Sequence, residues 1–171
     1  MSSTSSRSSI DIHGAPRLRT WTKLGATILP GSNTITTAED VDWAVGDVLL
    51  VTTTELPSTT DNATNQVEQV TVTAVLGPRQ LQVDPPFTHR HSSFWYTQPG
   101  FAPVDMRGEV ALLSRNVVVQ GDDTSDSQLF GSHLAAMHGS LLRLSGTELR
   151  RCGQAFVLGR CVAALPFARL A

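Results

Sequence analysis

The chain contains few of the residues that mark small disulfide-rich or metal-binding proteins. Cysteine accounts for 2 of its 171 residues. Two cysteines are too few for a disulfide framework, and Cys152 and Cys161 lack the paired spacing of a zinc site. A single disulfide between Cys152 and Cys161 is an interpretation that stays open. The cysteine pattern predicts no metal, and nothing in the sequence predicts a cofactor.

The sequence also lacks an excess of positive charge. Its formal net charge is −2 at pH 7. The densest basic group, Arg143, Arg150 and Arg151, is interrupted by leucines and does not form the stripe that follows a phosphate backbone. We therefore do not expect nucleic acid as a partner.

Long apolar runs are absent as well. None approaches the roughly 20 residues that a helix needs to cross a bilayer, so we expect no direct membrane insertion within this chain. The first residues, MSSTSSRSSIDI, have no apolar region typical of a signal peptide or anchor. Residues 1–11 are predicted to form a disordered lead-in.

Helical periodicity is missing too, because no window keeps it for three turns, and residues 132–137 form one turn at most. Short stretches with period-2 patterning are bounded by turn residues instead, and Gly77–Gln80 is predicted to close a hairpin. These features predict an all-β chain, with 40% hydrophobic residues to fill a core. The predicted strands before residue 90 are 26–30, 33–38, 48–55, 66–77 and 80–87.

The segment MRGEVALLSRNVVVQGD, residues 106–122, predicts strand, corner, strand and corner. Similar apolar runs stopped by glycine follow at residues 141–146, 148–153 and 155–159. Gly121 and Gly146 are about 25 residues apart, the length of one large coil of a β-solenoid. We expect residues 117–119 to stack on Leu142 and Leu144 of the next coil.

Several motifs in one order resemble the fibrocystin family. They are IHGAPRLRTWTKL, VDWAVGDVLLVTTTE, FTH, MRGEVALLSRNVVVQGD, FGSHLAAMHGS and RCGQAFVLGR, which lie between residues 12 and 160. The resemblance is to the eight-glycine (G8) domain and the right-handed parallel β-helix that fibrocystin and fibrocystin-L share with cell-surface hyaluronidases. It implies that residues 12–105 form the edge of a G8 domain with initial strands, and that residues 106–160 form coils of an incomplete, pectate-lyase-like solenoid.

The resemblance also implies an extracellular or cell-surface protein. Asn62-Ala63-Thr64 is a glycosylation sequon in a polar loop, which fits that location. The family pattern continues after LGR with tyrosine, proline and a His-Phe-His element, whereas this chain reads CVAALPFARLA. Residues 161–171 are therefore expected to be an atypical tail outside the fold.

Aromatic residues gather in one loop. Five of the ten, Phe87, Phe94, Trp95, Tyr96 and Phe101, lie within 15 residues. Aromatic rings stack on the C–H faces of sugars, so Phe94, Trp95 and Tyr96 are candidate saccharide ligands. The alternative is a loop that folds down and hides its rings.

Histidines offer weaker candidates. His89 and His91 have the i, i+2 spacing of a metal pair, although no third ligand follows, and exposed loop histidines are the alternative interpretation. His133 is a candidate for lining a ligand groove. The alternative for His133 is a hydrogen bond to a backbone carbonyl at a solenoid corner.

No carboxylate pair can be assigned to the general acid and base of a glycosidase. Asp42 and Asp47 fit a turn around Trp43, and Asp105 fits an ion pair with Arg107. Together with the family resemblance, this makes a non-catalytic receptor or coat module, which contacts glycans such as hyaluronan or another extracellular protein, the main hypothesis. A hyaluronan-degrading glycosidase and a fragment without autonomous activity are the alternatives.

Overall fold

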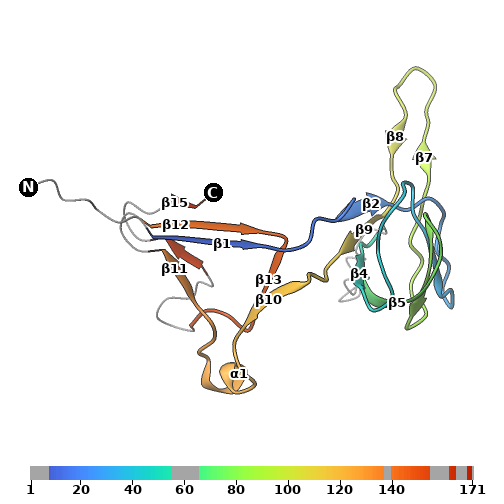
Figure 1. Cartoon of the computed structure of the whole chain (residues 1–171). Coiled ribbons are helices and arrows are strands. Elements are labelled where there is room, and N and C mark those ends of the chain that lie inside the picture. Colours follow the sequence, from blue (N-terminus) through green and yellow to red (C-terminus); the bar gives the residue numbers. More distant parts are fainter. Residues whose placement is uncertain (1–7, 55–65, 137–139, 155–161, 165–168, 171) are drawn as a thin grey trace, which may run out of the picture. The chain divides into compact units, whose positions relative to one another are not determined.

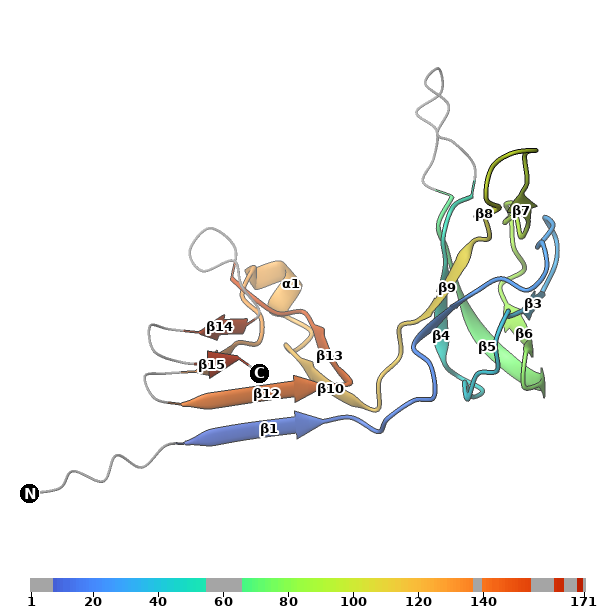
Figure 2. The ribbon, with the colours of Figure 1, turned by 90° about the horizontal axis from the view of Figure 1, so that it is seen from above.

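A computed structural model describes residues 8–54, 66–136, 140–154, 162–164 and 169–170. Within these residues the regular structure is almost entirely strand, with one helical turn, α1 (Ser125–Gln128). The chain divides into two compact units (Figures 1 and 2). Unit 1 contains residues 1–16 and 115–171, and unit 2 contains residues 17–114. The prediction of an all-β chain is confirmed.

Unit 2 is built on a six-stranded antiparallel sheet with the order β2-β9-β4-β5-β6-β3. Strand β9 lies between β2 and β4, so that Ala111 pairs with Trp21 on one side and with Leu50 on the other. The strands are β2 (Trp21–Lys23), β3 (Thr34–Thr36), β4 (Val48–Val51), β5 (Glu68–Gly77), β6 (Gln80–Asp84) and β9 (Glu109–Leu112).

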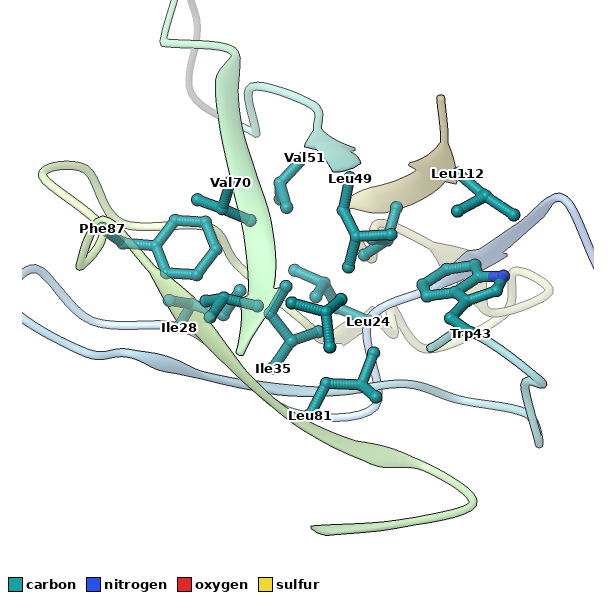
Figure 3. Close-up of a cluster of buried hydrophobic side chains, with 13 residues drawn as sticks. Leu24, Ile28, Ile35, Trp43, Leu49, Val51, Val70, Leu81, Phe87 and Leu112 are labelled. Carbon is teal, nitrogen blue, oxygen red and sulfur yellow. The ribbon is translucent and has the colours of Figure 1, made fainter. Parts of the chain in front are cut away.

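One face of this sheet carries the hydrophobic core. Along β4, Leu49 and Val51 are buried while Val48 and Leu50 are only half-buried, as the period-2 alternation of a strand requires. Each fully buried aliphatic side chain contributes about 1.5 to 3 kcal/mol before the entropy of ordering it is subtracted. The cluster contains Leu24, Ile28, Ile35, Trp43, Leu49, Val51, Val70, Val72, Leu81, Val83, Phe87, Val110 and Leu112 (Figure 3).

The segment before β4 forms the turn predicted from its DWAVGD sequence. Asp47 accepts a hydrogen bond from the Ala44 N–H at 2.8 Å, and Gly46 has a φ of 91° that glycine adopts without steric cost. Trp43 is buried, and its indole N–H donates to the Arg19 carbonyl at 2.8 Å. These contacts confirm the predicted roles of Asp47 and Trp43.

Local turn chemistry also sets the hairpin of β5 and β6. Gly77 pairs with Gln80 across the loop residues Pro78 and Arg79, as predicted. The predicted strand at residues 26–30 is wrong, because Ile28 forms only an isolated bridge with His91. A single bridge gives too few ladder hydrogen bonds to make that segment a strand.

Unit 1 contains three sets of parallel strands: the sheet β1-β12-β15 and the pairs β10-β13 and β11-β14. The chain visits the first, second and third sets in turn and then repeats that order (Figure 2). The strands are β1 (Ser9–His13), β10 (Val117–Gln120), β11 (Leu134–Ala136), β12 (Leu141–Ser145), β13 (Thr147–Arg150), β14 (Val162–Ala164) and β15 (Arg169–Leu170).

The register of these sets corrects the predicted stacking. Residues 117–119 pair with residues 147–149, whereas Leu142 pairs with Ile10. Partners in consecutive rounds are about 28 to 30 residues apart rather than about 25. The prediction failed because Gly121 follows β10 and Gly146 follows β12, so the two glycines mark different corners.

Boundaries differ from the predicted domains in three places. Residues 106–114 belong to unit 2, because β9 pairs with β2 and β4. Strand β1 includes residues of the predicted lead-in 1–11, and unit 2 is inserted between β1 and β10 instead of preceding the parallel strands. Strands β14 and β15 place residues of the predicted tail, 161–171, in the parallel sets.

Residues 132–137, for which the sequence allows one helical turn at most, contain β11, and the single helical turn of the described residues is α1. No helix in the described part of the chain has the length and apolarity needed to cross a membrane.

Candidate ligand-contact site

A hairpin between β6 and β9 extends from the sheet of unit 2 (Figure 1). Residues 94–106 form it and are called the finger below. Its strands are β7 (Trp95–Tyr96) and β8 (Val104–Asp105), which pair antiparallel. At the base, the Met106 N–H donates to the Phe94 carbonyl at 3.1 Å and extends the ladder by one pair.

The tip of the finger is a turn whose sequence explains its geometry. The Phe101 N–H donates to the Gln98 carbonyl at 3.1 Å, which closes a four-residue turn around Pro99 and Gly100. Gly100 has a φ of 85°. A proline followed by a residue with positive φ is the pattern of a type II turn, and glycine adopts that φ without strain.

The aromatic rings of the finger are exposed. Phe101 at the tip has 72% of its surface exposed, and the other three rings are about half exposed, whereas Phe87 before the finger is 1% exposed and belongs to the core. The interpretation in which this loop folds down and hides its rings is therefore wrong. The exposed fractions are 47% for Phe94, 53% for Trp95 and 52% for Tyr96.

Strand alternation divides the finger into two faces. Trp95 is paired with Asp105, so both side chains lie on one face, and Arg107 follows at the same period. Phe94 and Tyr96 lie on the opposite face. The predicted trio of Phe94, Trp95 and Tyr96 therefore does not form one surface.

The face opposite Trp95 contains two residues that the sequence prediction missed. Val104 pairs with Tyr96, and Met106 bonds to the backbone of Phe94, so all four side chains share this face. Val104 is 51% exposed and Met106 is 49% exposed. The signal for them was the alternation of Phe-x-Tyr and Val-x-Met on either side of Pro-Gly, which is typical of a hairpin.

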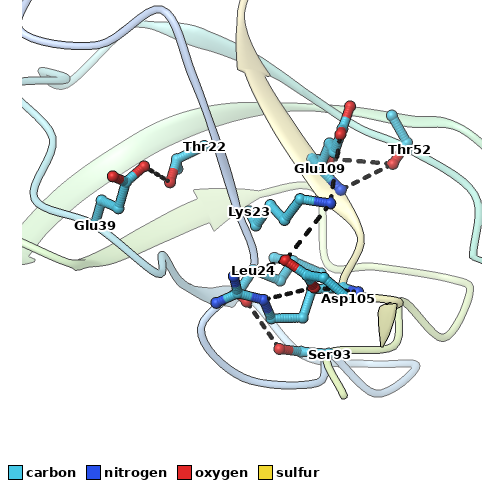
Figure 4. A network of polar contacts seen from close by, with 9 residues as sticks. Thr22, Lys23, Leu24, Glu39, Thr52, Ser93, Asp105 and Glu109 are labelled. Carbon is cyan, nitrogen blue, oxygen red and sulfur yellow. Dashed lines mark hydrogen bonds and ion pairs between the residues drawn. The ribbon is translucent and has the colours of Figure 1, made fainter. Parts of the chain in front are cut away.

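A polar cluster fixes the base of the finger. The Arg107 guanidinium donates two hydrogen bonds, at 2.9 and 2.8 Å, to the Asp105 carboxylate and lowers the pKa of Asp105 from 3.8 to about 2. Lys23 Nζ lies 3.8 Å from Asp105 and 3.6 Å from Glu109, joining the finger to β2 and β9 (Figure 4). The Arg107 guanidinium carbon lies 5.2 Å from the centroid of the Trp95 ring, within cation–π range.

His91 is not the exposed loop histidine that the alternative interpretation predicted. Its side chain is fully buried, with Nε2 2.7 Å from the Glu68 carboxylate and Nδ1 2.9 Å from the Thr52 carbonyl. The backbone N–H of His89 donates to the same carboxylate. Both ring nitrogens of His91 are therefore occupied, and the predicted i, i+2 pair holds the 88–91 segment against β4 and β5.

His133 lies in unit 1, apart from the finger in the sequence. Its Nδ1 lies 2.9 Å from the Gly131 carbonyl, which is the contact expected of a histidine at a corner, and its ring packs against Phe130. Phe130 lines a cavity of about 270 Å³ beside α1, together with Asp126 and Arg151. His133 is not among the residues that line this cavity, so its predicted role in a groove stays a prediction.

Two other predicted sites involve residues outside the described ranges. Asn62, the glycosylation candidate, lies outside the described residues. Cys152 is disulfide-bonded in the structure. Cys161, the other cysteine of the chain, lies outside the described residues, so the Cys152–Cys161 pairing stays a prediction.

Carboxylates in the described residues are held mainly by structural partners. Glu68 accepts hydrogen bonds from Thr88, and Asp122 accepts them from Thr124 and Ser125 at the start of α1. Asp42 accepts one from the Leu18 N–H at 2.8 Å. Over the same residues, no group of three or more His, Cys, Asp or Glu side chains is arranged to hold a metal ion.

Comparison with known proteins shows the family to which the chain belongs. A G8 domain-containing protein of Dictyostelium discoideum is 32% identical over 151 residues, covering 88% of this chain and 12% of that protein. Fibrocystin-L of Mus musculus is 28% identical over 115 residues, covering 67% of this chain and 3% of that protein. The chain belongs to the fibrocystin-like G8 family. The resemblance predicted from the sequence motifs is confirmed.

This G8-family chain spans only a small part of such relatives. Another of them, protein rliB of Dictyostelium discoideum, is 30% identical over 151 residues, which are 88% of this chain and 12% of that protein. No protein-family model matches the chain.

Solved structures give a looser likeness. The tailspike gp61 of Pseudomonas phage phi297 has a TM-score of 0.40 and 12% identity, covering 90% of this chain and 20% of that chain. The tailspike gp49 of Pseudomonas phage LKA1 has a TM-score of 0.38 and 14% identity, covering 90% and 24%.

Proposed function

We propose that this G8-family chain is a non-catalytic, glycan-contacting module of an extracellular or cell-surface protein, and that the finger makes the contact. One observation carries the proposal: the finger exposes Phe94, Trp95, Tyr96 and Phe101 on a hairpin that extends from the sheet. Soluble proteins rarely leave contiguous apolar surface exposed unless it binds something. Aromatic rings with a polar edge suit sugars, which have both C–H faces and hydroxyl groups.

The role of unit 1 in this proposal is that of a scaffold. The three parallel sets, visited twice in the same order, support its assignment as the first turns of a right-handed parallel β-helix of the pectate-lyase type. Each turn of such a solenoid buries its apolar side chains against its neighbours. In this proposal unit 1 is the support into which unit 2, with its finger, is inserted between β1 and β10.

The ion pairs that hold the carboxylates near the finger support the assignment of a non-catalytic module. A glycosidase needs one carboxyl group to protonate the leaving oxygen and another to act as base or nucleophile, about 5 to 9.5 Å apart. At the finger, Asp105 is held by Arg107 and its pKa is about 2, so it is deprotonated at neutral pH and unsuited to the acid role. Glu109 beside it forms an ion pair with Lys23.

Glycan binding by the whole chain tests the proposal. Wild-type chain, a Trp95→Ala/Tyr96→Ala double variant and a Trp21→Ala control are applied to an array that includes neutral glycans and hyaluronan. Trp21 is a suitable control because it is also an exposed tryptophan of unit 2 but lies on β2. We expect the double variant to lose binding and the control to keep it.

Equal binding by the double variant and the wild type would contradict the role of the finger. Loss of chain length in high-molecular-weight hyaluronan, incubated with the full-length protein, would contradict the non-catalytic assignment and favour the hyaluronidase-type alternative.

A further inference from the structure

The two faces of the finger differ in chemistry. On the face that carries Trp95, the guanidinium of Arg107 lies over the ring and the carboxylate of Asp105 is bonded beside it. On the other face, Phe94, Tyr96, Val104 and Met106 are each about half exposed, and no charged residue interrupts them. This second set of four is called the apolar face below.

Charge at the finger is balanced within the protein. Residues 94–104 contain no charged side chain. Among the described residues, the cations that form ion pairs with the finger are Arg107 and Lys23. Both are engaged: Arg107 by Asp105, and Lys23 by Asp105 and Glu109. A polyanionic ligand at the finger would have to displace these internal ion pairs, and each displaced carboxylate would then repel it.

Backbone pairing with a partner strand is also unfavourable here. Pro99 and Pro103 lack the N–H group that a ladder requires, and Pro103 immediately precedes β8. The β7-β8 ladder is only two residues long on each strand. A ligand is therefore held by side chains rather than by strand addition.

We propose that the apolar face, with Phe101 at the tip, binds an uncharged glycan, and that Trp95, Arg107 and Asp105 on the opposite face stiffen the finger without contacting the ligand. This inference rests on the proposed function and specifies its ligand class and binding face. The ring of Tyr96 stacks on the C–H face of a sugar. Its hydroxyl group, whose one hydrogen bond within the described residues is a 3.5 Å contact to Gln98, is available to sugar hydroxyls. Val104 and Met106 extend the apolar surface beside that ring.

Calorimetric titration of the whole chain tests the ligand class. The neutral probes are cellohexaose and chitohexaose, and the anionic probe is a hyaluronan hexasaccharide, each measured at low and high NaCl concentration. We expect a neutral probe to bind more tightly than hyaluronan, with an affinity that hardly changes with salt, because no ion pair forms on binding. Preferential binding of hyaluronan that weakens in high salt would overturn the uncharged-ligand proposal while leaving glycan binding intact.

Matched variants test the binding face. Tyr96→Ala is expected to weaken binding about tenfold or more, as for a central aromatic contact, while Tyr96→Phe keeps most of the affinity. Trp95→Phe, on the opposite face, is expected to stay near wild type. Both positions are exposed, so unchanged thermal unfolding confirms that the three variants remain folded.

The reverse pattern, with loss on Trp95→Phe and none on Tyr96→Ala, would overturn the assignment of the face. Binding to no glycan probe would contradict the proposed function itself. Tyr96-dependent binding to phosphatidylcholine vesicles without glycan binding would overturn both and identify a membrane-contacting loop.

Discussion

The Glu68 side chain holds together a segment that has little regular structure. Its carboxylate accepts hydrogen bonds from Thr88, His89 and His91, and the His91 ring reaches on to the Thr52 carbonyl. Burial by itself would raise the pKa of Glu68. The hydrogen bonds from Thr88, His91 and His89 outweigh burial and lower the pKa from 4.5 to about 2.

This lowered pKa predicts a specific loss of stability in acid. A carboxylate whose pKa is lower in the folded state stabilises the fold fully above its unfolded pKa, and that stability is lost as the pH falls from about 4.5 towards 2. The shift corresponds to a contribution of at most about 3 kcal/mol to the free energy of unfolding, and solvent screening of this partly exposed carboxylate reduces it. Urea unfolding of wild type and Glu68→Gln between pH 7 and pH 3 measures it.

We expect Glu68→Gln to be less stable than wild type at pH 7, with the difference shrinking as the pH falls through this window. The control is Glu109→Gln, a half-exposed carboxylate on the same sheet. A difference between wild type and Glu68→Gln that stays constant from pH 7 to pH 3 would contradict the prediction.

At the scale of elements, strand β4 shows how alternation sets the energetics of the sheet. It lies between β5 and β9, and its successive side chains point to opposite faces. Leu49 is fully buried in the core cluster, while Leu50 on the other face is half-buried and pairs with Ala111. Two adjacent leucines therefore have different roles.

Truncating each of these two leucines to alanine measures how much each face of β4 contributes to stability. Leu49→Ala is expected to lower the free energy of unfolding by about 2 to 5 kcal/mol, because it leaves a cavity in a packed core. Leu50→Ala is expected to cost about 1 kcal/mol, because part of its side chain is in water already. Chemical denaturation of both variants checks the prediction, and similar losses would mean that the outer face of β4 is packed as tightly as the core.

The finger shows the limit of sequence reasoning at this scale. The cluster of aromatic residues was evident, and their candidate role in ligand contact followed from their type. Which face of the finger each ring occupies follows only from the strand register, in which Trp95 pairs with Asp105. A shift of that register by one residue would have exchanged the faces.

On the scale of the whole molecule, the chain contains one unit inserted in another. Residues 17–114 leave and rejoin unit 1 through neighbouring strands of their own sheet, because Trp21 on β2 pairs with Ala111 on β9. The members of the core cluster all come from this range. Unit 2 therefore has its own core and adjacent ends, the features of an insertable domain.

Residues 17–114 are expected to fold without the rest of the chain. The isolated fragment should unfold cooperatively with heat and keep slow hydrogen exchange in β4, β5 and β9, since their ladders are internal to it. The same fragment with Leu49→Ala is the control for a weakened core. A fragment without cooperative unfolding would show that unit 2 depends on unit 1.

By itself, the sequence determined the class of the fold, its turns and its family. Period-2 alternation and local turn chemistry act over a few residues, so β5 and β6, the Asp47 turn and the strands on both sides of Ser114 could be predicted. The ordered motifs identified the G8 family. These features depend on neighbours in the chain, which a sequence displays directly.

Only the tertiary structure decided which strands are partners. Residues 106–122 contain the two predicted strands, yet β9 joins an antiparallel sheet in unit 2 and β10 joins a parallel pair in unit 1. The pairing of β1 with β12 spans the whole of unit 2. The burial of His91 depends on Glu68 of β5 and on Thr52, which follows β4. Parallel pairing and buried polar contacts join residues that are distant in sequence, and no local pattern encodes their register.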